Sequence, residues 1–165
     1  MNSLSQLILS ILSVLLIVQS FSFAEKPTLT KINSNARTLE LEYKFNPSEI
    51  DTKQNFENLI PNTQLYKIDN QFALVYEAII SVPSPDGFSI KNYRVVSTKI
   101  LPLTNISIDN LSEQKPVDLD GSLTQNLVSM EYQGIAGTRH IAKLRIIAAY
   151  ISKYMSKVLI QDNVS

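Results

Sequence analysis

The chain has 165 residues, with 15 basic and 15 acidic side chains and no cysteine. This balance of charge gives no reason to expect electrostatic capture of nucleic acid or of an acidic membrane. The lack of cysteine excludes disulfides, thiol nucleophiles and cysteine-ligated metal ions in this chain.

The first 24 residues have the features of a secretory signal peptide. They carry no charged side chain, and an apolar core runs from Leu7 to Val18. Ser22-Phe23-Ala24 supplies small residues at the spacing that signal peptidase needs, which predicts cleavage before Glu25. The leader lacks the usual early Lys or Arg. An uncleaved anchor over residues 4–24 is the alternative, because this stretch is just long enough to span a bilayer. We expect an exported protein, periplasmic, surface-bound or secreted and without stable membrane insertion after cleavage, in which residues 25–165 form one domain.

The first predicted strand of that domain has a period of two. From Arg37 to Phe45, apolar and charged residues alternate, as they do in a strand with one dry and one wet face. The dry face would hold Leu39, Leu41, Tyr43 and Phe45, and the wet face Glu40, Glu42 and Lys44. Asn46-Pro47-Ser48 ends the strand, since proline favours a turn. Residues 47–64 are mostly polar and predict a long loop, in spite of Phe56 and Leu59-Ile60.

The middle of the chain predicts two further strands. Gln71–Val82 is nearly continuously apolar, which suits a buried strand. Pro83-Ser84-Pro85-Asp86-Gly87 predicts a reversal. Phe88–Leu101 would return as a strand, with Val95, Val96 and Ile100 in the core.

Shorter alternating segments follow. Ile106 and Ile108 alternate before a polar linker at 113–116, and Asp120-Gly121 predicts another turn. Val128, Met130 and Tyr132 then share one parity. We place each of the four glycines in a turn. Short strands separated by proline and Asp-Gly turns predict an all-β fold, an antiparallel, jelly-roll-like β-sandwich.

The segment from Ile141 to Ile160 is open to two interpretations. Its apolar residues recur at helical spacing, with Lys153 and Lys157 one turn apart on the other side. An α+β fold with a C-terminal helix near 141–160 is therefore the alternative fold. The high β-branched content favours a hairpin instead, with strands near 139–149 and 156–164 and a turn at 152–154. The pattern alone slightly favours the helix.

Three stretches of this chain resemble a known family. Ile79-Ile80-Ser81-Val82-Pro83 precedes Asp86-Gly87, and Tyr93-Arg94-Val95-Val96-Ser97 follows. Further on come Gly134, Gly137, Arg139, Leu144-Arg145-Ile146 and Tyr150, in the family's order and spacing. Together they resemble the N-terminal propeptide domain of gingipain-type, caspase-like cysteine peptidases, which are secreted precursors of Bacteroidetes. Two departures are Ala148, where the family prefers proline, and Ile151-Ser152, where it has Asn-Pro.

The resemblance implies a concrete role. Such propeptides are non-catalytic β-sandwiches that keep a peptidase domain latent, assist its folding, and are typically exported by a type IX route. The partner would be a peptidase domain in the same precursor or in trans. A basic residue on a propeptide loop fills the substrate pocket in better-known members, and the candidates are Arg94, Lys99 and Arg139. The resemblance also favours the hairpin over the helix. An independent exported β-sandwich, acting as an adhesin or carbohydrate-binding module, is the alternative function.

Other residues that invite a functional reading have simpler explanations. His140 is the only histidine, so it lacks the partners that catalysis needs. Asp118-x-Asp120-Gly121 begins like a calcium loop, but Ser129 stands where the bidentate Glu belongs, which favours a simple turn. We treat the sequons at Asn105, Asn110 and Asn163 as chance, and the aromatic residues as core. We predict no catalytic residue, cofactor or metal ion.

Overall fold

The computed structural model describes residues 25–34, 38–68, 71–83, 88–106, 117–118, 127–152 and 157–165. The predicted signal peptide and the turn at 120–121 lie outside these residues, as does most of the turn at 83–87. Within them, no helix is long and apolar enough to cross a membrane. The strands are β1 (Thr28–Ser34), β2 (Leu39–Lys44), β3 (Thr63–Ile68), β4 (Gln71–Val82), β5 (Val95–Pro102), β6 (Val117–Asp118), β7 (Val128–Ala136), β8 (Arg139–Ser152) and β9 (Lys157–Val164). Three short 3-10 turns are η1 (Pro47–Glu49), η2 (Phe56–Asn58) and η3 (Leu103–Asn105).

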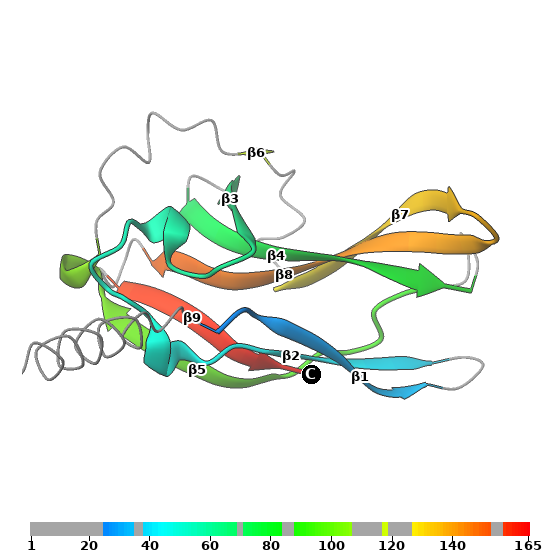
Figure 1. Cartoon of the computed structure of the whole chain (residues 1–165), viewed down its shortest axis with the longest axis horizontal. Helices are drawn as coiled ribbons and strands as arrows, with labels where there is room; N and C mark the ends of the chain where they lie inside the picture. The colour runs from blue at the N-terminus through cyan, green and yellow to red at the C-terminus, as the bar shows by residue number, and fades with distance from the viewer. Residues whose placement is uncertain are drawn as a thin grey trace, which may run out of the picture.

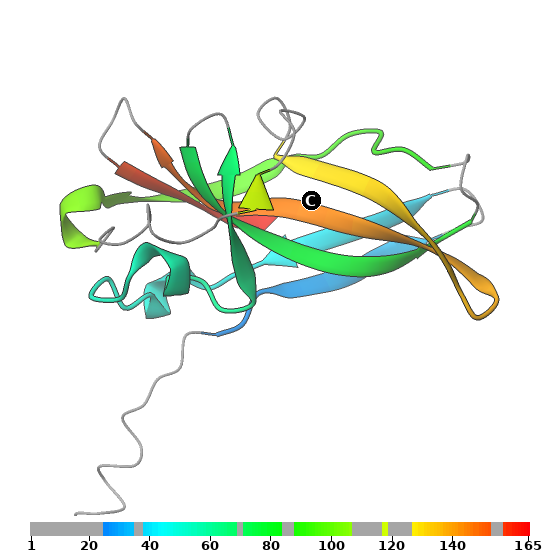
Figure 2. The same ribbon diagram turned by 90° about the horizontal axis from the view of Figure 1, so that it is seen from above.

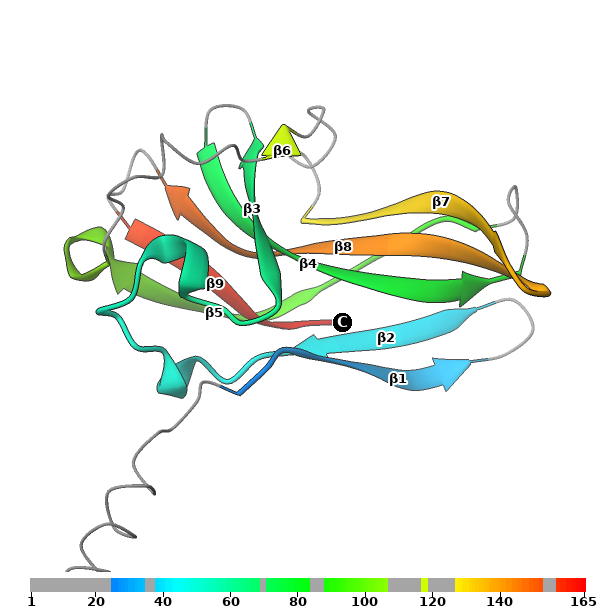
Figure 3. The same ribbon diagram turned by 45° about the horizontal axis from the view of Figure 1, so that its top comes forward.

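The strands form two layers that are joined at one corner (Figures 1 and 3). One layer contains β3, β4, β8 and β7, and the other contains β1, β2, β9 and β5. Every strand pair is antiparallel except β3 with β6 in the described chain. The predicted antiparallel β-sandwich is therefore confirmed.

The corner between the layers lies in β8. This strand pairs with β7 as far as Ile146 and then with β9 from Ala149 onward. Between them, the register with β4 jumps from Val75–Ile147 to Leu74–Ala149, so Ala148 is a bulge. Bulges bend a strand and let it pass from one sheet to the other. Ala148 thus marks the point where β8 exchanges β7 for β9 on one side, while it stays paired with β4 on the other.

Apolar side chains fill the space between the layers. The largest fully buried members of this main core are Tyr43, Phe56, Leu59, Ile60, Leu74, Ile160 and Val158. A second, smaller cluster packs beneath β3 and contains Tyr66, Ile68, Ala73, Val75 and Ile147. Tyr43 and Phe45 are buried as predicted, but Leu39 is 42 % exposed at the end of β2.

The C-terminal segment is a strand pair, β8 and β9, so the periodicity that favoured a helix over 141–160 is misleading. Residues 146–149 are all buried, because the main core covers one face of β8 and the second cluster covers the other. A strand that is buried on both faces loses its alternation, and its apolar run then also fits a helical period.

Three other predictions need correction. Residues 47–64 are not simply a loop, because Phe56, Leu59 and Ile60 enter the main core and β3 begins at Thr63. The strand predicted at 88–101 begins only at Val95, and Val96 and Ile100 are each 51 % exposed instead of buried. Within the described chain β5 pairs only with β9, and its register has a bulge at Val96. An edge strand with an open outer face alternates in sequence just as a core strand does.

Candidate interaction surface

The family-like run from Gly134 to Tyr150 forms the β7–β8 hairpin, which projects at one end of the molecule (Figure 1). Gly137 and Thr138 make its two-residue turn, and Gly137 has φ +63. Positive φ at the first turn position is what glycine supplies at least cost in a tight hairpin. Gly134 has φ +125 and lies at a register shift within β7, so it serves a bulge and not the predicted turn. Both glycines therefore shape the hairpin.

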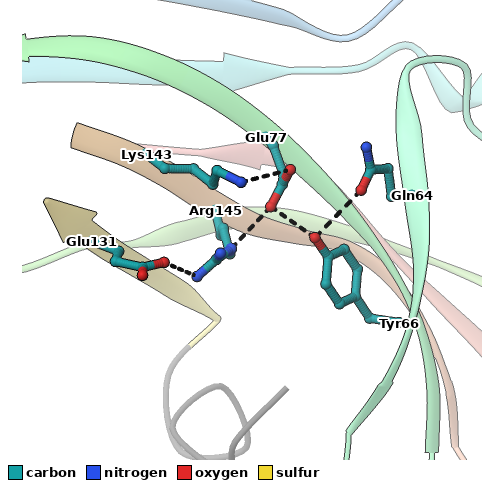
Figure 4. Close-up of polar contacts among 6 residues, drawn as sticks. All are labelled: Gln64, Tyr66, Glu77, Glu131, Lys143 and Arg145. Atoms are coloured by element: carbon teal, nitrogen blue, oxygen red, sulfur yellow. Dashed lines mark hydrogen bonds and ion pairs between the residues drawn. The ribbon is translucent and has the colours of Figure 1, made fainter. Parts of the chain in front are cut away.

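A polar network crosses the outer face of β4, β7 and β8 (Figure 4). Glu77 of β4 lies directly opposite Arg145 of β8 in the register. Arg145 Nε donates to Glu77 Oε1 at 2.9 Å, and its Nη1 lies 2.9 Å from Glu131 Oε2 on β7. Lys143 Nζ lies 3.5 Å from Glu77 Oε2, and the Tyr66 hydroxyl of β3 donates to Glu77 Oε1 at 2.8 Å.

The network is largely shielded from water at its centre. The Glu77 and Arg145 side chains are 18 % and 17 % exposed, whereas Glu131 is 56 % exposed. Burial alone would raise the pKa of Glu77, but hydrogen bonds from Arg145 and Tyr66 and the charge of Lys143 lower that pKa below its ordinary value. Burial and the hydrogen bond to Glu77 raise the pKa of Tyr66 to about 12. These groups link strands β3, β4, β7 and β8 and favour a structural role.

The family-like residues divide between packing and the surface. Leu144 and Ile146 belong to the main core, and Tyr150 packs against the second cluster. Arg145 is the centre of the polar network. Arg139 is exposed beside the turn at the hairpin tip. Of the charged residues in the run, Arg139 is thus the one placed to touch a partner first.

The three basic candidates differ in their surroundings. Lys99 is partly buried, and its Nζ donates to the Pro47 carbonyl at 2.9 Å, so it holds η1 against β5. Arg94 is exposed, but its backbone pairs with Ser165 in both directions beside the body of the domain. Arg139, Arg94 and Lys99 are not brought together in one site.

His140 occupies a structural position. The Tyr132 hydroxyl lies 2.8 Å from His140 Nδ1, and the Tyr132 ring lies between those of Phe88 and His140, at 6.2 Å and 6.0 Å. Asn163 lies in β9 and donates to Glu42 Oε1, so its sequon is part of a paired strand. Among the described residues, no group of three or more His, Cys, Asp or Glu side chains could hold a metal ion.

The partners of Arg145 were not predicted from the sequence. Glu77 sits in a nearly continuous apolar run, and Tyr66 lies between the loop predicted at 47–64 and the strand predicted from Gln71, in a stretch assigned to no element. A single acidic residue within a nearly continuous apolar run was the available signal, because a carboxylate that is shielded from water requires a partner. Arg145, in the family-like run, is that partner.

The similarity of this chain to known proteins lies in its structure. No protein-family model matches the chain, and no curated protein matches it. A solved structure of gingipain K from Porphyromonas gingivalis, determined to explain its zymogenic latency, is similar with a TM-score of 0.48 and 14 % sequence identity. The similarity covers 86 % of this chain and 92 % of the other.

Proposed function

We propose that this chain is a non-catalytic, propeptide-like domain of a secreted cysteine peptidase precursor, which keeps the peptidase latent and assists its folding. The observation that carries this proposal is the run from Gly134 to Tyr150. Its residues resemble those of gingipain-type propeptides in order and spacing, and they shape the β7–β8 hairpin, pack in the core or hold the polar network. A sequence match whose members serve a bulge, a turn and a polar network is better support than a match of letters alone.

The hairpin tip is the surface that we assign to the peptidase domain. Arg139 is exposed there, and Ile135, also near the tip, is 64 % exposed. Ile79 of β4, which is paired with Lys143 of β8 farther from the tip, is a second apolar residue with an exposed side chain, at 58 %. An exposed cation at the tip of a projecting hairpin suits entry into the pocket of a peptidase that cleaves after basic residues. As part of this proposal, residues 1–24 direct export of the precursor, which then reaches the cell surface by a type IX route.

The test compares matched arginine variants. Arg139→Ala should weaken inhibition of a gingipain-type peptidase added in trans, because it removes the basic group at the tip. Arg94→Ala removes an exposed arginine whose backbone pairs beside β5 and should inhibit like the wild type. Equal inhibition by both variants would contradict the assignment of the hairpin tip.

A further inference from the structure

The outer edge of β7 is open along a groove. Within the described chain β7 pairs only with β8. The segment 88–94 runs beside β7 without strand structure (Figure 2), and no backbone hydrogen bond joins the two described segments. A groove of about 610 Å³ lies between them, lined by Phe88, Ile90, Lys91, Tyr93, Val128 and Met130 among others.

The register identifies which backbone groups face this groove. Ile147 N donates to Leu127 O, and the two-residue turn makes Ala136 and Arg139 the closing pair of the hairpin. In an antiparallel pair, successive residues direct their N–H and C=O groups alternately toward the partner strand and away from it. Ser129 and Glu131 therefore direct theirs toward β8. Val128, Met130 and Tyr132 direct theirs toward the groove, which leaves a row of backbone donors and acceptors without a strand partner.

The side chains beside this edge have a definite pattern. Val128 belongs to the main core and the Tyr132 ring contacts that of Phe88; Met130 shares their face because side chains alternate along a strand. Glu131 faces the outer side, is 56 % exposed, and has one carboxylate oxygen held by Arg145. A strand added at this edge would place the side chains of one face opposite Met130, where apolar residues are favoured. The side chains of its other face would lie opposite Glu131, where a cation is favoured. The exposed Lys91 lines the groove and is the one cation there that would oppose a basic partner, within the described residues.

We propose that this groove receives an extended strand of a partner polypeptide, which extends the sheet at β7 and alternates apolar residues with basic ones. Addition of a strand to an open edge gains its affinity from the main chain and its specificity from alternate side chains. Tyr93 limits the groove at one end, because its hydroxyl accepts a hydrogen bond from Leu127 N. The bulge at Gly134 interrupts the edge at the other end, so the straight segment is 128–132.

The probe is a capped hexapeptide of alternating valine and lysine. It is added to the full chain, and the hydrogen-exchange rates of the backbone amides are measured with and without it. We expect slower exchange at Val128, Met130 and Tyr132, and weaker binding of the same peptide with glutamate in place of lysine. N-methylation of one alternating set of residues should abolish binding, whereas N-methylation of the other set should be tolerated. This asymmetry arises because only alternate N–H groups of an added strand face the edge.

Two variants separate the edge from the side chains. Met130→Pro removes an N–H that points into the groove and should weaken binding about tenfold, the equivalent of one hydrogen bond. Met130→Ala keeps this N–H and should bind more tightly than Met130→Pro. The proposal is overturned if both N-methylated peptides behave alike, or if the peptide does not bind. Slower amide exchange at β1 or β5 on adding the peptide, in place of β7, would also overturn the proposal. So would slow exchange at Val128, Met130 and Tyr132 before any peptide is added.

Discussion

Glu77 and Arg145 face each other directly across the β4–β8 ladder, and Arg145 Nε lies 2.9 Å from Glu77 Oε1. Their positions are 68 residues apart in the sequence. Because Arg145 also reaches Glu131, one guanidinium links β8 to both of its neighbours in this layer. The pair holds the base of the hairpin whose tip we assign to a partner.

Removing this arginine should destabilise the fold. Arg145→Met leaves Glu77 without its main partner in a site that is mostly shielded from water, at a cost of roughly 1–3 kcal/mol in the free energy of unfolding. Urea denaturation measures this change. The matched control is Lys44→Met, which breaks an ion pair to Glu42 whose lysine is 57 % exposed. That exposed pair should contribute less than about 1 kcal/mol, and an equal loss in both variants would contradict the account.

The network also predicts a pH dependence. Because the folded state lowers the pKa of Glu77, the carboxylate contributes stability above its ordinary pKa of 4.5, and this contribution is lost as the pH falls through the lowered value. The difference in unfolding free energy between the wild type and Glu77→Gln should therefore be largest above pH 4.5 and shrink in acid. A difference that stays constant from neutral to acidic pH would show that Glu77 acts without its charge.

Two tyrosines should respond in opposite ways to loss of the hydroxyl. Tyr43 is fully buried, and its hydroxyl makes no hydrogen bond with the described residues. Tyr43→Phe removes an unsatisfied polar group and should leave stability unchanged or raise it. Tyr66→Phe removes the hydrogen bond to Glu77 and should cost about 1 kcal/mol. Chemical denaturation of both variants tests the contrast, which fails if Tyr43→Phe is the more damaging.

The glycine turn should tolerate no larger residue without a cost. Gly137→Ala forces a side chain onto a position with φ +63, although no atom lies within 4 Å of the added Cβ. The expected loss of about 1 kcal/mol is thus conformational. Thr138→Ala, at the neighbouring turn position without positive φ, is the control and should be nearly neutral. Thermal denaturation compares the two, and equal midpoints would contradict this role of Gly137.

The corner residue offers a test of the bulge. Ala148 has no pairing partner in β4, β7 or β9, whereas Ala149 pairs with both Leu74 and Ile160. Ala148→Pro should therefore be less destabilising than Ala149→Pro, since proline interrupts a ladder but is accepted at bulges. A greater loss for Ala148→Pro, measured by denaturation, would show that packing at this fully buried position dominates.

The strands that follow simple alternation could be predicted from sequence, and the exceptions have physical causes. β2 and β7 alternate apolar with polar residues, with Tyr43 and Val128 buried, so their alternation indicates a strand directly. β8 was ambiguous because it is buried on both faces near Ala148; the β-branched content and the resemblance favoured a strand there, whereas the apolar spacing slightly favoured a helix. Val96 and Ile100 were misassigned because edge position depends on which strand pairs with which, and local sequence does not carry that information.

The candidate surface was only partly predictable for the same reason. Arg139 could be proposed from the family-like run, and its exposed place at the tip agrees with a contact role. Lys99 was an equal candidate in sequence, but its ammonium group is held by the Pro47 carbonyl. The lone acidic residue Glu77 in an apolar run indicated that a partner was needed, but which residues partner it depends on pairing between distant strands, and local sequence does not carry that information.

The most direct test of the central proposal is to titrate this chain against an active gingipain-type peptidase and follow cleavage of a peptide substrate. The account predicts a saturable loss of activity, which is weaker for Arg139→Ala than for Arg94→Ala. Peptidase activity that remains undiminished at saturating concentrations of the folded chain would contradict the proposed role as a latency domain.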